Sequence, residues 1–139
     1  MSYEAWVAAV DMGYGHQRAA YPLRHLSPTN KVIIANNYEG IPKKDRLVWK
    51  KSQDFYEFFS RTKTWPLIGD WMFNTFIDNP QRIYNFYPRR DLSKPNFQLR
   101  YNYKLIRAGW GKDLVDFFNK KDIPLITTFF SVAFFAEEH

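Results

Sequence analysis

Apolar residues are concentrated in three short runs along the chain. The first run covers residues 6–12, the second residues 31–36 and the third residues 124–129. Short apolar runs that include β-branched residues are typical of strands buried on both faces of a parallel sheet. The pattern therefore predicts a narrow parallel sheet of three strands.

A helix is expected between the first two strands. It covers residues 17–26 and ends before the segment 27–30, where Pro28 cannot continue a helix. A strand, a helix and a second strand within about 30 residues form a βαβ unit with a right-handed crossover. The start of the chain therefore predicts an α/β fold.

After the second strand the apolar residues recur three and four apart, as they do in helices. Helices are predicted to open at Pro42, at residues 64–66 and at residues 93–95, and a fourth covers residues 112–121. We therefore expect a large helical insertion, about residues 42–121, between strands two and three. The apolar faces consist of Val48, Trp49, Ser52, Phe55, Tyr56 and Phe59 in the first helix, of Ile68, Trp71, Met72 and Phe76 in the second, and of Leu99, Tyr103 and Ile106 in the third, which Gly109 ends.

The third strand is followed by a predicted last helix. Ser131 is expected to cap this helix, and the sequence stops inside it without a terminating glycine or proline. We expect residues 1–139 to form one Rossmann-like domain whose narrow sheet is completed elsewhere. Either the chain is an incomplete piece of a longer α/β protein, or another chain supplies the partner strands.

Composition limits the classes of site and the compartment. The 139 residues include no cysteine, which excludes disulfide bonds, thiolate metal sites and cysteine nucleophiles and fits a reducing compartment. The N-terminus lacks the pattern of a secretory signal, and the most apolar stretch, residues 124–136, is shorter than the roughly 20 residues of a spanning helix. We expect a cytoplasmic protein that is able to lie on the inner face of a membrane.

The net charge of +6 is unevenly distributed, because residues 43–121 hold 17 Lys/Arg against 8 Asp/Glu. Most aromatic residues lie in the same segment, a mixture that suits anionic lipid headgroups or nucleic acid. Stacking on bases favours a sheet over helices, which disfavours nucleic acid. The alternative is an ordinary solvated face over an aromatic core. Within this segment, residues 87–91 are interpreted either as an anionic-headgroup site or as a salt-bridged turn.

The turn after the first strand carries the candidate chemistry. Gly13 and Gly15 let the main chain approach a ligand closely, and the following helix offers unpaired N–H groups. His16 follows directly, at the edge where open α/β sheets bind ligands, and an imidazole there would accept a proton from a substrate hydroxyl. The alternative is a helix-start histidine that bonds the backbone and does no chemistry.

Two neighbouring side chains belong to the same candidate site. Asp11 ends the first strand and is expected either to orient His16 or to cap the helix. Arg18, in the first helical turn, is expected to meet an anion or to be solvated. His25 and His139 are isolated in sequence, so no metal site is predicted.

Two generic nucleotide motifs do not fit the turn. The nicotinamide fingerprint requires a glycine where Arg18 stands and an acidic residue at the end of the second strand, where Asn36 and Asn37 stand instead. The phosphate-binding P-loop requires Gly-Lys-Ser/Thr, which is absent from the sequence. Neither cofactor class is therefore expected.

The longer string from Val10 to Ala20 resembles the first loop of the monogalactosyldiacylglycerol synthase family. It is more distantly similar to the peptidoglycan lipid-intermediate N-acetylglucosaminyltransferase. The resemblance covers residues 6–26 and extends loosely to residues 123–138, where Thr127 and Thr128, Ala133, Ala136 and Glu137 are similar to a later strand-helix junction. It leaves the helical middle unmatched.

The resemblance implies the N-terminal half of a two-domain GT-B glycosyltransferase, which receives a lipid or another hydroxyl acceptor. It implies Gly13 and Gly15 as glycines lining the acceptor cleft and His16 as base or acceptor ligand, in a metal-independent transfer without a cofactor. Tyr14 stands where the family has a glycine and would contact the acceptor. The nucleotide-sugar donor of such enzymes binds mainly in a C-terminal domain, so this chain alone is expected to be inactive. The rival hypothesis is a non-catalytic module that binds an anionic metabolite or a membrane surface.

Overall fold

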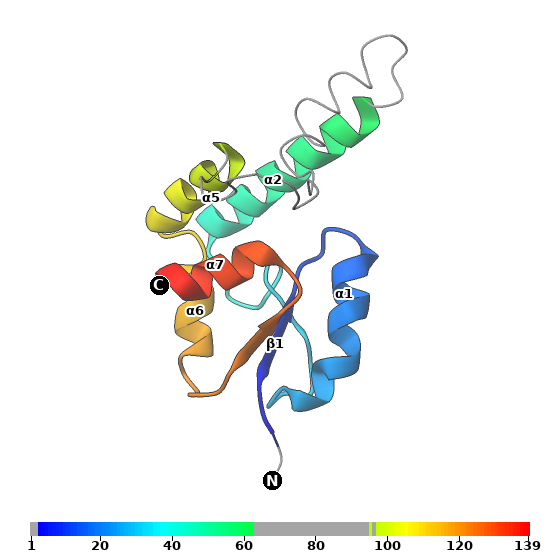
Figure 1. The fold of residues 1–139 in the computed structure, drawn as a ribbon, viewed down its shortest axis with the longest axis vertical. Helices are drawn as coiled ribbons and strands as arrows, with labels where there is room; N and C mark the ends of the chain where they lie inside the picture. Colours follow the sequence, from blue (N-terminus) through cyan, green and yellow to red (C-terminus); the bar gives the residue numbers. More distant parts are fainter. Residues whose placement is uncertain (1–2, 63–94, 96) are drawn as a thin grey trace, which may run out of the picture. The chain divides into compact units, whose positions relative to one another are not determined.

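The computed structural model describes residues 3–62, 95 and 97–139. Their contacts define two compact units, one made of Met1–Trp49 and Leu105–His139 and the other of Lys50–Lys104. The sheet and the candidate site both lie in the first unit. Figure 1 shows the first strand of this sheet together with the helix that follows it and the last helix of the chain. The predicted helix that opens at residues 64–66 and the segment 87–91 lie outside the described residues.

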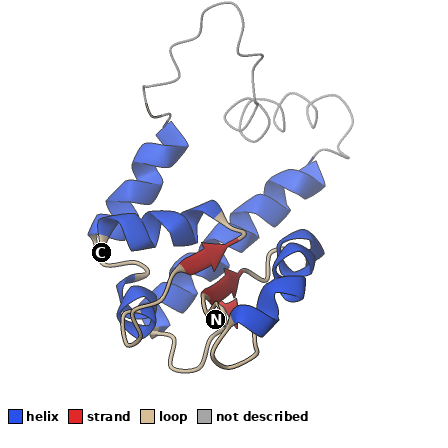
Figure 2. Cartoon of the chain, turned by 60° about the horizontal axis from the view of Figure 1, so that its bottom comes forward, coloured by secondary structure: helices blue, strands red, loops and turns tan. Residues whose placement is uncertain are grey.

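The first unit contains a three-stranded parallel sheet, as the apolar runs predicted (Figure 2). Its strands are β1 (Trp6–Ala9), β2 (Ile33–Ile34) and β3 (Leu125–Thr127), in the order β2-β1-β3. In the register of β1, Ala8 lies beside both Ile33 and Thr127. A mixed α/β unit of this kind is consistent with a fragment of a Rossmann-like fold.

All three strands are shorter than the apolar runs that predicted them. β2 stops at Ile34 because the N–H of Asn37 donates to the Ile34 carbonyl and turns the chain. β1 stops at Ala9. Two residues later, the side chain of Asn36, which lies beyond the end of β2, bonds the main chain of Asp11.

The helix predicted over residues 17–26 is two elements. α1 (Tyr14–Ala20) begins three residues earlier than expected, and the 3₁₀ helix η1 (Tyr21–Leu26) continues it. Pro22 explains the change of helix type, since it has no N–H to donate to an α-helical carbonyl. The predicted end before Pro28 is confirmed, because Ser27 is extended.

Three further helices lie between β2 and β3 in the described residues: α2 (Lys43–Thr62), α5 (Phe97–Arg107) and α6 (Lys112–Phe118). α2 begins directly after Pro42 as predicted, and α6 ends three residues earlier than predicted. The apolar stripe of α2 is buried at Trp49, whereas Phe55 is 53% exposed. None of the helices that the structure describes is long and apolar enough to cross a membrane.

The last helix, α7 (Phe130–Glu138), corrects one expectation. Ser131 does not cap it, because the helix starts earlier, with Phe129 in the N-cap position and no side-chain cap. The N–H of Val132 donates to the Phe129 carbonyl at 3.1 Å, and Ser131 lies inside the helix, buried.

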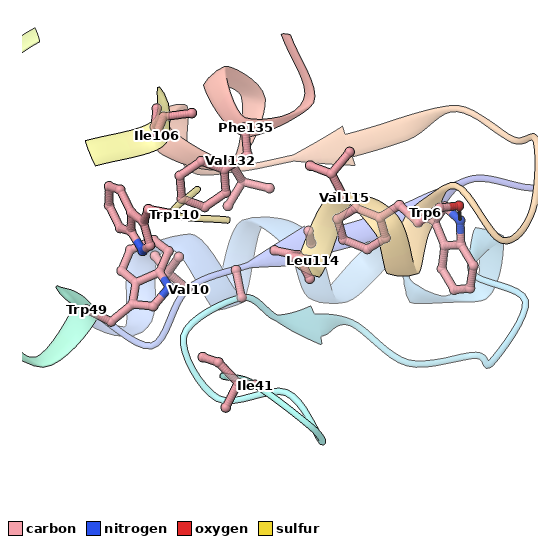
Figure 3. Close-up of a cluster of buried hydrophobic side chains, with 13 residues drawn as sticks. Trp6, Val10, Ile41, Trp49, Ile106, Trp110, Leu114, Val115, Val132 and Phe135 are labelled. Atoms are coloured by element: carbon pink, nitrogen blue, oxygen red, sulfur yellow. Dashed lines mark hydrogen bonds between the residues drawn. The ribbon is translucent and has the colours of Figure 1, made fainter. Parts of the chain in front are cut away.

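The side chains of β1 alternate between two separate cores. Val7 and Ala9 point to one face of the sheet, where they pack with Ala20 of α1 and apolar residues of η1. The opposite face carries the larger core, which Figure 3 shows. Its buried members are Trp6, Ala8, Val10, Ala35, Ile41, Trp49, Ile106, Trp110, Leu114, Val115, Phe118, Val132 and Phe135. Because helices cover both faces of β1, its carboxyl end is left as the place where polar groups meet.

Candidate functional site

Two strand-to-helix turns meet at the carboxyl end of the sheet. β1 runs into α1 through residues 10–13, and β3 runs into α7 through Thr128 and Phe129. β1 lies between β2 and β3, so the chain leaves it first to one side and later returns on the other. This reversal of direction is where open α/β sheets bind their ligands.

His16 joins these two turns by contacts on several sides. Its Nδ1 lies 2.8 Å from the main-chain oxygen of Thr128, and the Thr128 hydroxyl donates to the His16 carbonyl at 3.0 Å. The imidazole also meets the Phe129 ring edge-on, with 5.0 Å between ring centroids. The side chain is half-buried, which places it at the rim of the sheet, neither inside the core nor free in solvent.

Asp11 makes contacts other than those predicted for it. Its Oδ1 accepts a hydrogen bond from Gln17 Nε2 at 2.8 Å, and the N-cap position of α1 is taken by Gly13 without a side-chain cap. The hydrogen bond that orients His16 is the one that its Nδ1 donates to the Thr128 carbonyl. Asp11 therefore connects the end of β1 to the side of α1 and remains exposed at the rim.

Asn36 holds the main chain of Asp11 at both of its polar groups. The Asn36 Oδ1 accepts from the Asp11 N–H at 2.8 Å, and Nδ2 donates to the Asp11 carbonyl at 3.1 Å. The side-chain amide thus makes the two hydrogen bonds that the main chain of a neighbouring strand would make. These bonds fix the start of the turn that leads to His16. The sequence signal for this role is an asparagine directly after an apolar strand.

The two glycines of the turn differ in their backbone requirements. Gly13 has a φ of +104°, a value that side chains disfavour, so the prediction of a glycine-dependent turn is confirmed there. Gly15 is the second residue of α1, and a Cβ added to it would meet nothing within 4 Å. The expectation that Gly15 belongs to the loop is therefore wrong, because α1 begins at Tyr14.

The two remaining candidates of the turn point into solvent. The Tyr14 side chain is 80% exposed at the first position of α1. Arg18 is exposed and lies in the last turn of α1, not in its first turn, again because the helix starts early. Its exposure agrees with the solvated alternative, and its place in the last turn separates it from the free N–H groups at the start of α1.

A second polar cluster is buried where α2 begins. Asp45 is 2% exposed; its Oδ2 accepts from the Gly111 N–H at 3.1 Å, and its Oδ1 has no hydrogen-bond partner. Burial raises the pKa of the Asp45 carboxyl, partly opposed by the Gly111 hydrogen bond and by the charge of Lys44. His139 Nε2 donates to the Trp110 carbonyl at 3.2 Å, so the turn before α6 is held from two elements.

Tyr38 and Asp113 form a neighbouring pair, with 2.7 Å between the tyrosine hydroxyl and Oδ2 of the aspartate. Burial and this hydrogen bond to a carboxylate raise the pKa of Tyr38 well above its usual range. The hydroxyl therefore stays protonated and acts as a donor to α6. Neither this pair nor Asp45 was predicted, because nothing in their spacing distinguishes them from solvated polar residues.

The histidines lie apart in the fold as well as in the sequence. His25 Nδ1 donates to the Pro22 carbonyl at 2.8 Å within η1, whereas His139 bonds the turn before α6. Across residues 3–62 and 97–139, no group of three or more His, Asp or Glu side chains is arranged to hold a metal ion.

Comparisons with protein-family models, with curated proteins and with solved structures find no match for this chain.

Proposed function

We propose that this chain is the acceptor-side half of a two-domain GT-B glycosyltransferase, with a helical insertion at about residues 42–121 and a sheet completed by further strands. The enzyme transfers a sugar from a nucleotide-sugar donor to a hydroxyl group of a lipid or another acceptor. The resemblance of the string Val10 to Ala20 supports the reaction class. The anchored imidazole of His16 at the carboxyl end of β1 supports the site.

The chemistry assigned to the site is general base catalysis. His16 takes the proton from the acceptor hydroxyl while the hydroxyl oxygen forms a bond to the anomeric carbon of the sugar. The bond from that carbon to the nucleoside diphosphate breaks, and the nucleotide leaves with the electron pair. The imidazolium then returns its proton to solvent, so the proposed site needs neither a metal nor a cofactor.

The neighbours of His16 receive binding roles in this proposal. Tyr14, exposed at the start of α1, contacts the acceptor, and Gly13 lets the main chain approach it. Asp11 contributes an exposed carboxylate that can accept a hydrogen bond from a second acceptor hydroxyl. Arg18 and Gly15, both on α1, are proposed to contact the headgroup of the acceptor.

One observation favours a second candidate, a non-catalytic binding module. The reciprocal hydrogen bonds between His16 and Thr128 are also what a purely structural contact between two turns requires. In that case the same rim binds an anionic metabolite, and the basic segment 43–121 docks on a membrane surface. The two candidates differ in whether the second ring nitrogen of His16 does any chemistry.

A sugar-transfer assay on the protein encoded by the complete reading frame tests the proposal. Labelled UDP-galactose and UDP-N-acetylglucosamine are offered with a short-chain diacylglycerol in micelles, and glycosylated lipid is measured by mass spectrometry. His16→Asn is the matched variant, because its amide nitrogen replaces Nδ1 and retains the bond to Thr128 while Nε2 is lost. We expect an unchanged melting temperature and turnover reduced by roughly 10² to 10⁴, as for loss of a general base.

His16→Gln is the control, because its amide nitrogen takes the place of Nε2 and the Thr128 bond is lost. Transfer at the wild-type rate by His16→Asn would remove the base from the mechanism and favour the binding module. Absence of any transfer with every donor and acceptor, in a folded wild-type protein, would overturn the proposed reaction itself.

A cytoplasmic position on the inner face of a membrane completes the proposal. The net charge of residues 43–121 is positive, and cationic segments bind anionic lipids in a salt-dependent manner. Flotation with anionic vesicles at low salt is expected to carry the protein upward, and high salt is expected to release it. Failure to float at low salt would exclude electrostatic membrane binding.

A further inference from the structure

We infer that Thr128 is the positioning residue for His16: its main-chain carbonyl fixes the neutral imidazole in the Nδ1–H form, so that Nε2 is the atom that accepts the proton. This inference rests on the proposed function for its catalytic meaning only. The ring state that it specifies is measurable in the protein without substrate.

The tautomer follows from the chemistry of the two partners. A carbonyl oxygen only accepts hydrogen bonds, so the 2.8 Å contact with Thr128 requires Nδ1 of His16 to carry the proton. A neutral imidazole has one N–H. The lone pair therefore lies on Nε2, on the opposite side of the ring from the anchored atom. Catalytic and metal-binding histidines are oriented in the same manner, by a hydrogen bond to the nitrogen that does not react.

The carbonyl of Thr128 is held in place by the sheet. The Thr128 N–H donates to the Ala8 carbonyl at 3.3 Å, which continues the pairing of β3 with β1 by one residue. Thr127 fixes the next peptide, since its hydroxyl lies 3.2 Å from the Phe129 nitrogen and 3.3 Å from the Phe129 oxygen. The acceptor that orients His16 is thus built on a rigid element, as a preorganised site requires.

The hydroxyl of Thr128 adds a second hydrogen bond in the opposite direction. It donates to the His16 carbonyl at 3.0 Å, so residues 16 and 128 are joined by a closed pair of hydrogen bonds across 112 positions of the chain. The edge of the ring meets Phe129 at an interplanar angle of 87°, which restricts rotation of the imidazole. Together these contacts define the position of Nε2 before an acceptor arrives.

Nitrogen NMR of the protein labelled with ¹⁵N-histidine tests the inference at about pH 8, where an ordinary imidazole is neutral. We expect His16 to show a protonated Nδ1 and an unprotonated Nε2. His25 and His139 are internal controls, because their hydrogen bonds to carbonyls require Nδ1–H in the first and Nε2–H in the second. A protonated Nε2 in His16 would overturn the inference.

Variants of Thr128 separate the hydroxyl from the carbonyl. Thr128→Val retains the shape and the main-chain carbonyl but loses the hydrogen bond from the hydroxyl to the His16 carbonyl. Thr128→Ser restores that hydrogen bond. Because both variants retain the carbonyl that accepts from Nδ1, we expect the single Nδ1–H form of His16 in Thr128→Val and in Thr128→Ser, with the ring held less firmly in Thr128→Val. In the transfer assay, Thr128→Val should lower kcat roughly tenfold with little change in KM, the effect of one lost hydrogen bond.

The two proposals fail in distinguishable ways. A single Nδ1–H form in wild type together with full transfer by His16→Asn would refute the base and leave the positioning contact intact. An identical kcat in Thr128→Val and wild type would refute the role of the hydroxyl. If Thr128→Val does not fold, the wild-type spectrum still decides the tautomer.

Discussion

Two side chains in this protein hold a distant main chain in place, and their surroundings differ. His16 donates from Nδ1 to the Thr128 carbonyl at the half-buried rim of the sheet. Asp45 accepts from the Gly111 N–H in the interior, where it is 2% exposed. Each side chain uses one polar atom for the contact and has a second one: Nε2 of the histidine and Oδ1 of the aspartate.

Exposure determines what the second atom does. At the half-buried rim, the nitrogen that is not used for anchoring is the atom proposed to act on a ligand, and anchoring the ring lowers the cost of orienting it. In the interior, an oxygen without a hydrogen-bond partner loses its hydration and gains nothing in return, which raises the pKa of the Asp45 carboxyl. The same kind of contact is therefore a candidate for function in one place and a cost to stability in the other.

The largest expected effect is at the turn that Asp45 holds. Gly111 has a φ of +83°, and a Cβ there would overlap the Phe135 ring. Gly111→Ala is expected to reduce the free energy of unfolding by roughly 3 kcal/mol, from backbone strain together with overpacking. Gly40→Ala is the matched control, because its φ is +85° and a Cβ would meet nothing within 4 Å. Urea denaturation of both variants separates strain from overpacking, and equal losses would contradict the overlap.

Asp45 itself is expected to have the next largest effect. Asp45→Ala leaves the Gly111 N–H without a partner in the interior and should cost about 1–3 kcal/mol. Thermal or urea unfolding at pH 5 and pH 7 measures this loss. A variant as stable as wild type would mean that the hydrogen bond to Gly111 contributes nothing.

The pH dependence of Asp45→Asn tests the sign of its pKa shift. Burial raises the pKa of Asp45 in the folded protein, so its contribution is fully present below the usual aspartate pKa of about 3.9 and is lost as pH rises through the raised value. Asn does not titrate, so the stability of Asp45→Asn relative to wild type should increase as pH rises from 3 to 7. The nearby charges of Lys44, Asp113 and His139 are the same in both proteins. A difference that stays constant with pH would contradict the raised pKa.

The fold could be predicted from sequence to the level of its strands but not to their ends. The apolar runs identified β1, β2 and β3, of which β1 is buried throughout and β2 and β3 are only partly buried. Their ends depend on contacts such as the Asn36 amide on Asp11, which involve residues 25 positions apart and leave no periodic signal. The switch to η1 was predictable from Pro22.

The turn that carries the candidate site could be predicted from sequence, but the contacts of its side chains could not. A glycine-rich turn followed by His16 is visible in the sequence because glycine is needed where φ is positive, as at Gly13. The partner of His16 is a main-chain oxygen, which every residue has, so no residue type at position 128 indicates it. Asp45 is hidden for the opposite reason, since an aspartate near the start of a helix is expected in any solvated helix.

Measurements of stability separate the anchoring of His16 from its proposed role as a base. His16→Ala removes the hydrogen bond to Thr128 and the ring contact with Phe129 and should cost about 1 kcal/mol of unfolding free energy. His16→Asn retains the hydrogen bond and should keep a melting temperature close to that of wild type. Melting curves of the two variants measure the difference, and equal losses would show that the Nδ1 contact does not stabilise the rim.

Gly15 is expected to show the smallest effect, and with the opposite sign. It lies inside α1 with open space where a Cβ would stand, so Gly15→Ala should stabilise the protein by roughly 0.5–1 kcal/mol. The fold therefore gives no reason for glycine at this position, whereas close approach of an acceptor to the start of α1 would give one. Gly15→Ala that is more stable but transfers sugar more slowly would place Gly15 at the ligand surface of the rim. A variant that is more stable and equally active would remove Gly15 from the site and leave Gly13 as the glycine that the turn requires.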